Sequence, residues 1–302
     1  GPLDMHVGRH HVIMPHEEAA FAHAVAAHPR ARIIAGATDV GLWITKALFD
    51  PETTIFAGGV RELQNISVED DVLMVGAAVT QETFAKTVAE ISPSLGEMMR
   101  RFGGLQVRSA GTVGGNIANG SPIGDLPPAL IAAGATLVIA RLGSRRYLPL
   151  EEFFIAYGKQ DLEPGEYVRG VHIPLDGLAR LTCHKISKRF DSDISALMLA
   201  IALDFDGDTV REARIAAGGM AATPRRARAA EAALAGRRYD RDAIAAAAAA
   251  LAEDFAPISD LRASAEYRRT VAANLLTRDF IERTDPDTPT RIAGAAVAGL
   301  AA

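Results

Sequence analysis

The sequence is short of cysteine, of net charge and of long apolar runs. Cys183 is its one cysteine, so the chain can form no internal disulfide and can hold no iron-sulfur cluster with its own thiolates. No apolar run approaches the length of a membrane span, and no signal-peptide core is present. A net charge of -5 gives no basic surface for nucleic acid. We therefore expect a cytoplasmic protein that binds neither membrane nor nucleic acid.

Metal-ligand patterns are missing as well. Six of the eight histidines fall within the first 28 residues, yet none is spaced with carboxylates as metal ligands usually are. We predict no metal site. The opening "GPLDM" looks like the remnant of a cleaved tag and is left out of the fold prediction.

Glycine, in contrast, is concentrated. Residues 102–125 hold seven of the 27 glycines among 302 residues, beside the apolar run "LPPALIAA". Glycine loses more backbone entropy on folding than any other residue, so such a density needs a compensating role.

The chain divides near residue 180 into two α+β parts. Helices are predicted at 15–28 and, around Pro93, at 80–102; 31–48 reads as a buried strand, a turn and a helix. Strands are predicted at 53–59, 70–80 and 166–174, and residues 127–143 read as a helix followed by a strand. From 181 on, strand, loop, long strand, "DGDT" turn, strand and helix precede helices at 240–255 and 263–283. We expect domains at 8–178 and 180–284 and a frayed tail at 285–302.

Two glycine-containing stretches share one physical property. "IIAGATDVG" (33–41) runs from a strand into a turn before a helix, and "SAGTVGGNIANGSPIGD" (109–125) is longer. Backbone amides exposed in such turns bind anions, which favours a diphosphate ligand. Neither stretch fits a Walker loop or the dinucleotide fingerprint of the doubly wound fold. Asp125 can also be read as the N-cap of the helix that follows it.

The motifs "AGATDVGLWITK", "RRFGGLQVRSAGTVGGNIANGSPIGDLPPALIAAGA", "HKISKRFDSDIS" and "RIAAGGMAATPRRA" together resemble the flavoprotein part of the molybdenum hydroxylases. The likeness is greatest to the small subunit of bacterial xanthine dehydrogenase without its iron-sulfur region. It implies an FAD-binding fold of the p-cresol methylhydroxylase type, built from two α+β subdomains. A C-terminal α+β domain of the carbon monoxide dehydrogenase flavoprotein type would follow.

The resemblance also implies a set of FAD contacts, with no residue in a proton-transfer role. The first loop would wrap the diphosphate, the glycine segment would complete the cradle, and Asp125 would bond a sugar or ribityl hydroxyl. Phe102 would cover the isoalloxazine ring, Ile173 would pack against it, and Lys185 would lie near it as a cation. The implied contacts are Ala35, Gly36, Ala37, Thr38, Asp39, Val40, Phe102, Gly111, Thr112, Gly114, Gly115, Asn116, Asp125, Ile173 and Lys185.

The function implied is electron transfer within a larger oxidoreductase of purine catabolism. FAD would receive electrons from 2Fe-2S clusters, themselves reduced at a molybdenum cofactor, on partner chains or in a region not present here, and NAD would be the acceptor. One alternative is the FAD-carrying medium subunit of a carbon monoxide, aldehyde or aromatic hydroxylase. A second is an assembly protein that keeps the fold without flavin. The chain is either a separate subunit or a fragment, and the two readings stay open.

Overall fold

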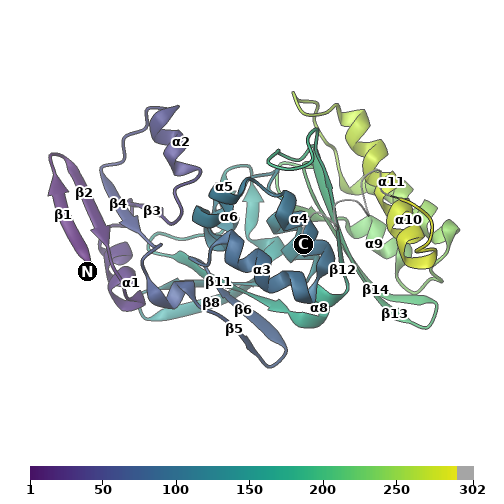
Figure 1. Cartoon of the computed structure of the whole chain (residues 1–302), viewed down its shortest axis with the longest axis horizontal. Coiled ribbons are helices and arrows are strands. Elements are labelled where there is room, and N and C mark those ends of the chain that lie inside the picture. The colour runs from purple at the N-terminus through teal and green to yellow at the C-terminus, as the bar shows by residue number, and fades with distance from the viewer. Residues whose placement is uncertain (291–302) are drawn as a thin grey trace.

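A computed structural model describes residues 1–290, which form sheets at the N-terminal end, in the middle and at the C-terminal end, with helices packed between and around them (Figure 1). The N-terminal sheet has the strand order β1-β2-β4-β3, in which β1 and β2 are antiparallel and β4 runs parallel to both of its neighbours. Its elements are β1 (Leu3–Val7), β2 (His10–Met14), α1 (Glu18–Ala27), β3 (Arg32–Ile34), α2 (Val40–Thr45) and β4 (Thr53–Phe56).

Two expectations for this region are wrong. The opening residues that we left out form part of β1, because they pair with β2 in register from Leu3 to Val7. β3 is not a buried strand: Ile34 is buried, but Ile33 and Arg32 are exposed, since β3 is the outer strand of the sheet. The segment that follows, with α2, projects away from the rest of the molecule (Figure 1).

The middle sheet is antiparallel, with the order β5-β6-β11-β7-β8. One of its faces packs against α3, α4, α6 and α7 in the largest hydrophobic core, and the other face meets α1, where Phe21 contacts the ring of Tyr167. The elements are η1 (Arg61–Gln64), β5 (Ile66–Glu69), β6 (Val72–Gly76), α3 (Gln81–Ile91), α4 (Pro93–Arg101), α5 (Leu105–Ala110), α6 (Val113–Asn119), α7 (Leu126–Ala132), β7 (Thr136–Arg141), β8 (Ser144–Pro149), η2 (Leu150–Glu152), β9 (Phe154–Ala156), β10 (Lys159–Gln160), β11 (Tyr167–Pro174) and α8 (Leu175–Ala179).

The C-terminal sheet is antiparallel, with the order β12-β13-β14-β15, and lies between two layers of helices. α9, α10 and α11 cover one face with a second core, while the other face packs against α4 and α7 (Figure 1). Successive side chains of β12 therefore point to different partners. Its elements are β12 (Leu181–Ile186), β13 (Leu197–Asp206), β14 (Thr209–Gly218), β15 (Arg225–Arg226), α9 (Arg228–Leu234), α10 (Arg241–Asp254) and α11 (Ala265–Thr284).

Ion pairs reinforce the contact between the middle and C-terminal sheets. Glu151 in η2 accepts hydrogen bonds from Arg214 and Arg226 at 3.1 and 3.2 Å, and both arginines belong to the C-terminal sheet. These charges hold the pKa of Glu151 below its usual value although burial opposes them. Of the predicted tail, 285–290 is described, and Thr290 there donates a 2.6 Å hydrogen bond to Glu282; 291–302 lies outside the described residues. Within residues 1–290, no helix is long and apolar enough to cross a membrane.

Candidate functional site

The loop between β3 and α2 presents backbone amides in a strained conformation. Ala37 has a φ of +56°, a left-handed conformation that costs a non-glycine residue about 1–2 kcal/mol. Among the described residues, the amides of residues 36–39 donate to no protein acceptor. Successive free amides around a left-handed residue form a concave anion site, and backbone strain is concentrated at ligand sites. The amides of this loop are therefore available to a ligand that accepts hydrogen bonds.

Gly36 brings this loop against the glycine segment. A Cβ on Gly36 would lie 1.9 Å from the carbonyl oxygen of Ala110, so that only glycine allows the two backbones to touch. Gly41, five residues further on, has no neighbour within 4 Å of the equivalent position. The close approach brings together the two stretches that the sequence marked out.

The glycine segment 111–116 differs from the expected bed of free amides. Most of its N–H groups already have protein acceptors: Gly114 donates to the carbonyl of Ala77 at 2.9 Å, and Gly115 to the Thr112 hydroxyl at 3.0 Å. Gly114 packs so closely on Ala77 that a Cβ there would lie 2.3 Å from the alanine methyl. The start of α6 is therefore anchored to the segment before α3, and the role of residues 111–116 in an FAD cradle stays a prediction.

What the segment offers instead is space and one unpaired acceptor. A Cβ on Gly115 would meet Thr112 Oγ1 at 2.8 Å and no other heavy atom within 4 Å. The Oδ1 atom of Asn116 is buried and has no hydrogen-bond partner within the described part of the chain. A buried acceptor without a donor is costly, so Asn116 fits a ligand that brings a hydroxyl or N–H group.

Asp125 and Lys185 form a buried ion pair between the two parts of the chain. Lys185 Nζ donates to Asp125 Oδ2 at 2.7 Å, to Ser195 Oγ at 2.7 Å and to the Asp193 carbonyl at 2.9 Å. The Ser195 hydroxyl in turn donates to Asp125 Oδ1 at 2.5 Å. All three ammonium protons therefore have protein acceptors, while each carboxylate oxygen retains a lone pair for a ligand hydroxyl.

This pairing corrects our reading of Asp125 as a helix cap. Asp125 occupies the N-cap position of α7, but its side chain makes no capping hydrogen bond because the carboxylate is turned toward Lys185. Lys185 is 3% exposed, and its placement near a flavin remains a prediction.

Phe102 ends α4 and begins a tight turn to α5. Gly103 has a φ of +54°, which favours glycine at this position. Arg108 Nη1 lies 3.1 Å from the carbonyl oxygens of residues 100, 102 and 103, which have no partner within α4, and its Nε donates to Glu82 at 2.9 Å. The hydrogen bond from Arg108 holds the pKa of Glu82 below its usual value. Phe102 is half-buried against the main core.

Sequence reasoning missed several residues around these groups. The turn after α4 and the buried ion pair are held by Arg108, Ser195 and Arg101. The Oε1 atom of Gln81 is buried and has no hydrogen-bond partner in the described part of the chain, and a Cβ on Gly111 would lie 3.0 Å from this atom. Their contacts join positions up to 89 residues apart, so no local pattern could have revealed them. Ile173, by contrast, lies in β11 within the main core, and its predicted contact with a flavin remains untested by this placement.

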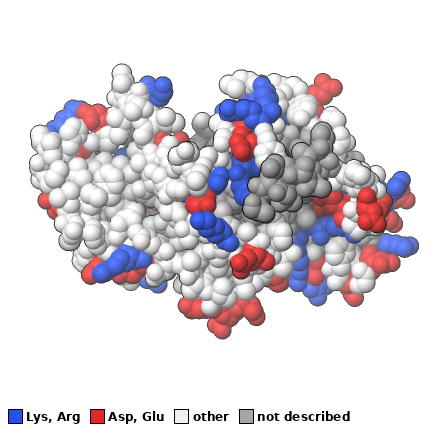
Figure 2. Space-filling view, in the orientation of Figure 1, with Lys and Arg blue, Asp and Glu red and all other residues white. Residues whose placement is uncertain are grey.

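Figure 2 shows this face of the molecule hollowed between the projecting α2 segment and the rest of the molecule. A strained loop with free amides, fixed to a glycine-rich segment with an unpaired acceptor, is the kind of arrangement that suits a phosphate-containing ligand. The model of the FAD binding domain in molybdopterin dehydrogenase matches residues 7–176, and that of the CO dehydrogenase flavoprotein C-terminal domain matches 182–283. The chain belongs to the FAD-binding part of the molybdenum hydroxylase family.

Individual relatives cover the chain to very different extents. The nicotinate hydroxylase of Emericella nidulans is 29% identical over 274 residues, and the xanthine dehydrogenase of the same organism is 27% identical over 269. The matches include 83% and 84% of this chain but 20% of each relative, so the chain spans about a fifth of their length. The carbon monoxide dehydrogenase medium chain of Hydrogenophaga pseudoflava is 28% identical, with 82% of this chain and 87% of the relative covered.

Solved structures agree with this assignment. A chain of quinoline 2-oxidoreductase from Pseudomonas putida 86 superposes with a TM-score of 0.82 at 28% identity, and the match covers 92% of this chain and 98% of that one. Carbon monoxide dehydrogenase from Hydrogenophaga pseudoflava gives the same TM-score and identity, with 91% and 96% covered. The α+β fold with its C-terminal flavoprotein-type domain is thereby confirmed.

Proposed function

We propose that the chain is the FAD-carrying electron-transfer part of a xanthine-dehydrogenase-type molybdenum hydroxylase, and that NAD is its electron acceptor. The observation that carries the proposal is the loop 36–39, whose free amides and left-handed Ala37 suit a diphosphate. Partner chains or regions would supply the 2Fe-2S clusters and the molybdenum cofactor. We propose domain boundaries at 8–178 and 180–284 and a location in the cytoplasm.

The residues proposed to hold FAD act by position and polarity. The amides of 36–39 would bind the diphosphate, and Asn116 Oδ1 would accept a hydrogen bond that the protein leaves unmade. Asp125 would accept from a sugar or ribityl hydroxyl while it stays paired with Lys185. The complete proposed set is Ala35, Gly36, Ala37, Thr38, Asp39, Val40, Phe102, Gly111, Thr112, Gly114, Gly115, Asn116, Asp125, Ile173 and Lys185.

Bound FAD supplies the two-electron and one-electron chemistry that links a hydride acceptor to one-electron clusters. The chain's own part is to orient the isoalloxazine ring and to surround it with fixed charges. The Lys185 ammonium, buried at 3% exposure, would favour negative charge on a ring bound near it. Because its protons are already held by protein oxygens, its effect would be electrostatic, without proton transfer.

A second candidate is the medium subunit of a carbon monoxide, aldehyde or aromatic hydroxylase. The 87% coverage of the carbon monoxide dehydrogenase medium chain favours it, because this chain would then be nearly a whole subunit. A flavin-free assembly protein is the third candidate, and the free amides of residues 36–39 argue against it.

One experiment separates the candidates. The purified chain is saturated with FAD, freed of excess and mixed with NADH without oxygen, and the visible flavin absorbance is followed. Bleaching by NADH is expected, with electrons passed on to an artificial dye. Flavin that dithionite reduces and NADH does not would favour the medium-subunit candidate. If the chain binds no FAD, the assembly protein is the candidate that remains. Xanthine oxidation by the chain without a partner would refute the proposal.

A further inference from the structure

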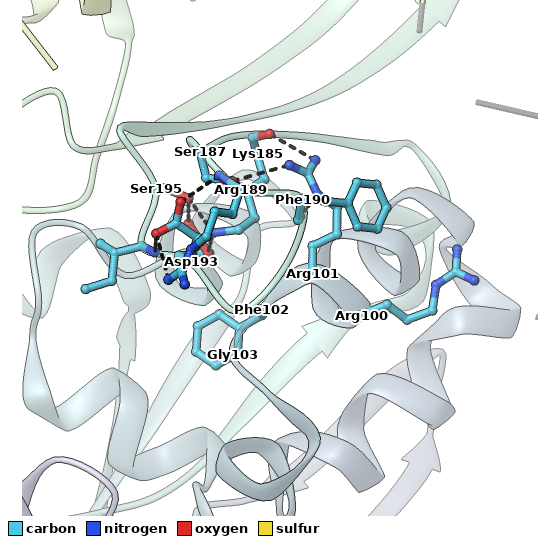
Figure 3. A network of polar contacts seen from close by, with 12 residues as sticks. Arg100, Arg101, Phe102, Gly103, Lys185, Ser187, Arg189, Phe190, Asp193 and Ser195 are labelled. Carbon is cyan, nitrogen blue, oxygen red and sulfur yellow. Dashed lines mark hydrogen bonds and ion pairs between the residues drawn. The ribbon is translucent and has the colours of Figure 1, made fainter. Parts of the chain in front are cut away.

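The loop of residues 187–194, between β12 and β13, lies against the end of α4 (Figure 3). It carries Phe190, a large apolar side chain that is 52% exposed, and Ser192 has a φ of +51°. An exposed phenylalanine on a strained loop calls for an explanation, because neither feature contributes to a core.

Arg101 is the side chain that reaches this loop from α4. Its Nε donates to the Phe190 carbonyl at 2.8 Å and its Nη1 to the Lys185 carbonyl at 3.0 Å, while Nη2 lies 3.5 Å from the Ser187 hydroxyl. The guanidinium carbon of Arg101 lies over the Phe190 ring, 5.3 Å from the ring centroid, within cation–π range. Arg100, one residue earlier, points away from the loop (Figure 3).

The loop is also tied down at its base. The Asp193 carbonyl accepts from Lys185 Nζ, and the Asp193 carboxylate accepts from the Arg189 amide at 2.8 Å, which holds the pKa of Asp193 below its usual value. Arg101 therefore bonds the strand end and the tip of a loop whose base is already closed. Its guanidinium is the link between the tip and α4.

The residue after Arg101 is Phe102. The carbonyls of residues 100, 102 and 103 are held by Arg108, which is paired with Glu82. The turn that carries Phe102 is thus fixed by Arg108 on one side and joined to the 187–194 loop through Arg101 on the other. A movement of the loop tip must break the Arg101 hydrogen bonds or pull on this turn.

We propose that Arg101 is a positioning residue that couples the 187–194 loop to Phe102, so that the same guanidinium holds the loop tip and the turn that carries the aromatic ring. The part that concerns flavin rests on the proposed function. We call the contacts of Arg101 with Phe190 and the Lys185 carbonyl the clasp. The clasp requires a planar group that can donate in several directions and lie against a ring, which arginine provides and lysine does not.

The first test measures the clasp without any flavin signal. Trypsin cuts after Lys188 and Arg189, within the loop, and mass spectrometry reports those two cuts separately from all others. We expect Arg101→Ala to be cut there about tenfold faster than the original chain, because charge-assisted hydrogen bonds that keep the loop closed are lost. Phe190→Leu should give a smaller increase, and Arg100→Ala, the matched control, should give none.

The second test measures the coupling. In FAD-saturated protein, Arg101→Ala should shift the visible absorption bands of the flavin, whereas Arg100→Ala should not, and Arg101→Lys should not restore the original bands. Unchanged trypsin cutting in Arg101→Ala would overturn the clasp. Faster cutting with an unchanged spectrum would overturn the coupling to Phe102. A chain that binds no FAD would refute the proposed function and the flavin part of this proposal, while the trypsin comparison would still decide the clasp.

Discussion

The ion pair between Lys185 and Asp125 allows a quantitative prediction for Lys185→Met. The two side chains are 1% and 4% exposed, so the substitution leaves a carboxylate in a site with almost no water. Removing one partner of a buried pair costs about 3–5 kcal/mol, because the desolvated charge that remains is not compensated. We therefore expect the free energy of unfolding of the flavin-free chain to fall by about 3–5 kcal/mol.

A double-mutant cycle separates the pair from its surroundings. Asp125→Asn alone should also be costly, but the double variant Lys185→Met with Asp125→Asn should be more stable than Lys185→Met, since no charge remains buried. Urea unfolding followed by circular dichroism measures all three variants in the absence of FAD. The control is Lys188→Met in the exposed loop, with an expected change within about 0.5 kcal/mol. A loss below about 1 kcal/mol for Lys185→Met, or strictly additive costs, would refute the reasoning.

Three further predictions concern backbone strain, close packing and acid. Ala37→Gly should stabilise the flavin-free chain by about 0.5–1 kcal/mol in urea unfolding, because the left-handed strain of alanine exceeds the extra chain entropy of glycine; a loss would contradict it. Gly36→Ala should lower thermal stability and FAD retention through its collision with Ala110, whereas Gly41→Ala, in open space, should change neither. The pKa of Asp279 is held at about 2, since hydrogen bonds and charges from its neighbours outweigh burial, so about 2 kcal/mol of stability should be present above pH 4 and lost as the pH falls toward 2. Acid unfolding of Asp279→Asn should lack that part of the pH dependence.

Regular elements were predictable where the sequence repeats a simple pattern. Asp240 is the N-cap of helix α10, and its carboxylate accepts from the Ala243 amide at 2.9 Å; the alanine-rich run of the helix follows the expected propensity. The turn between β13 and β14 lies where "DGDT" places it, with Gly207 at a φ of +57°. Pro93 separates α3 from α4, as its missing N–H requires.

The site was predictable in its location more than in its chemistry. A high local content of glycine indicates that the backbone approaches another group closely, but it does not identify that group as protein or ligand. Gly36 packs against Ala110 and Gly114 against Ala77, so both glycines serve chain-to-chain contact, although the sequence suggested contact with a ligand. The side-chain partners of Lys185 lie at the start of α7 and after the 187–194 loop, and such pairings depend on the packing of two sheets.

The alternation of side chains along β12 has a consequence for how its register is chosen. Cys183 and Lys185 face the α4 and α7 side, while Thr182 and His184 face α11, where Thr182 donates a 2.5 Å hydrogen bond to Asp279. A slip of one residue against β13 would exchange the two faces and would place an ammonium beside helix carbons while Asp125 lost its counterion. Because each face of β12 carries a side chain bonded to a buried carboxylate, charge pairing as well as apolar burial opposes such a slip, and the two carboxylates help to fix the register of this strand.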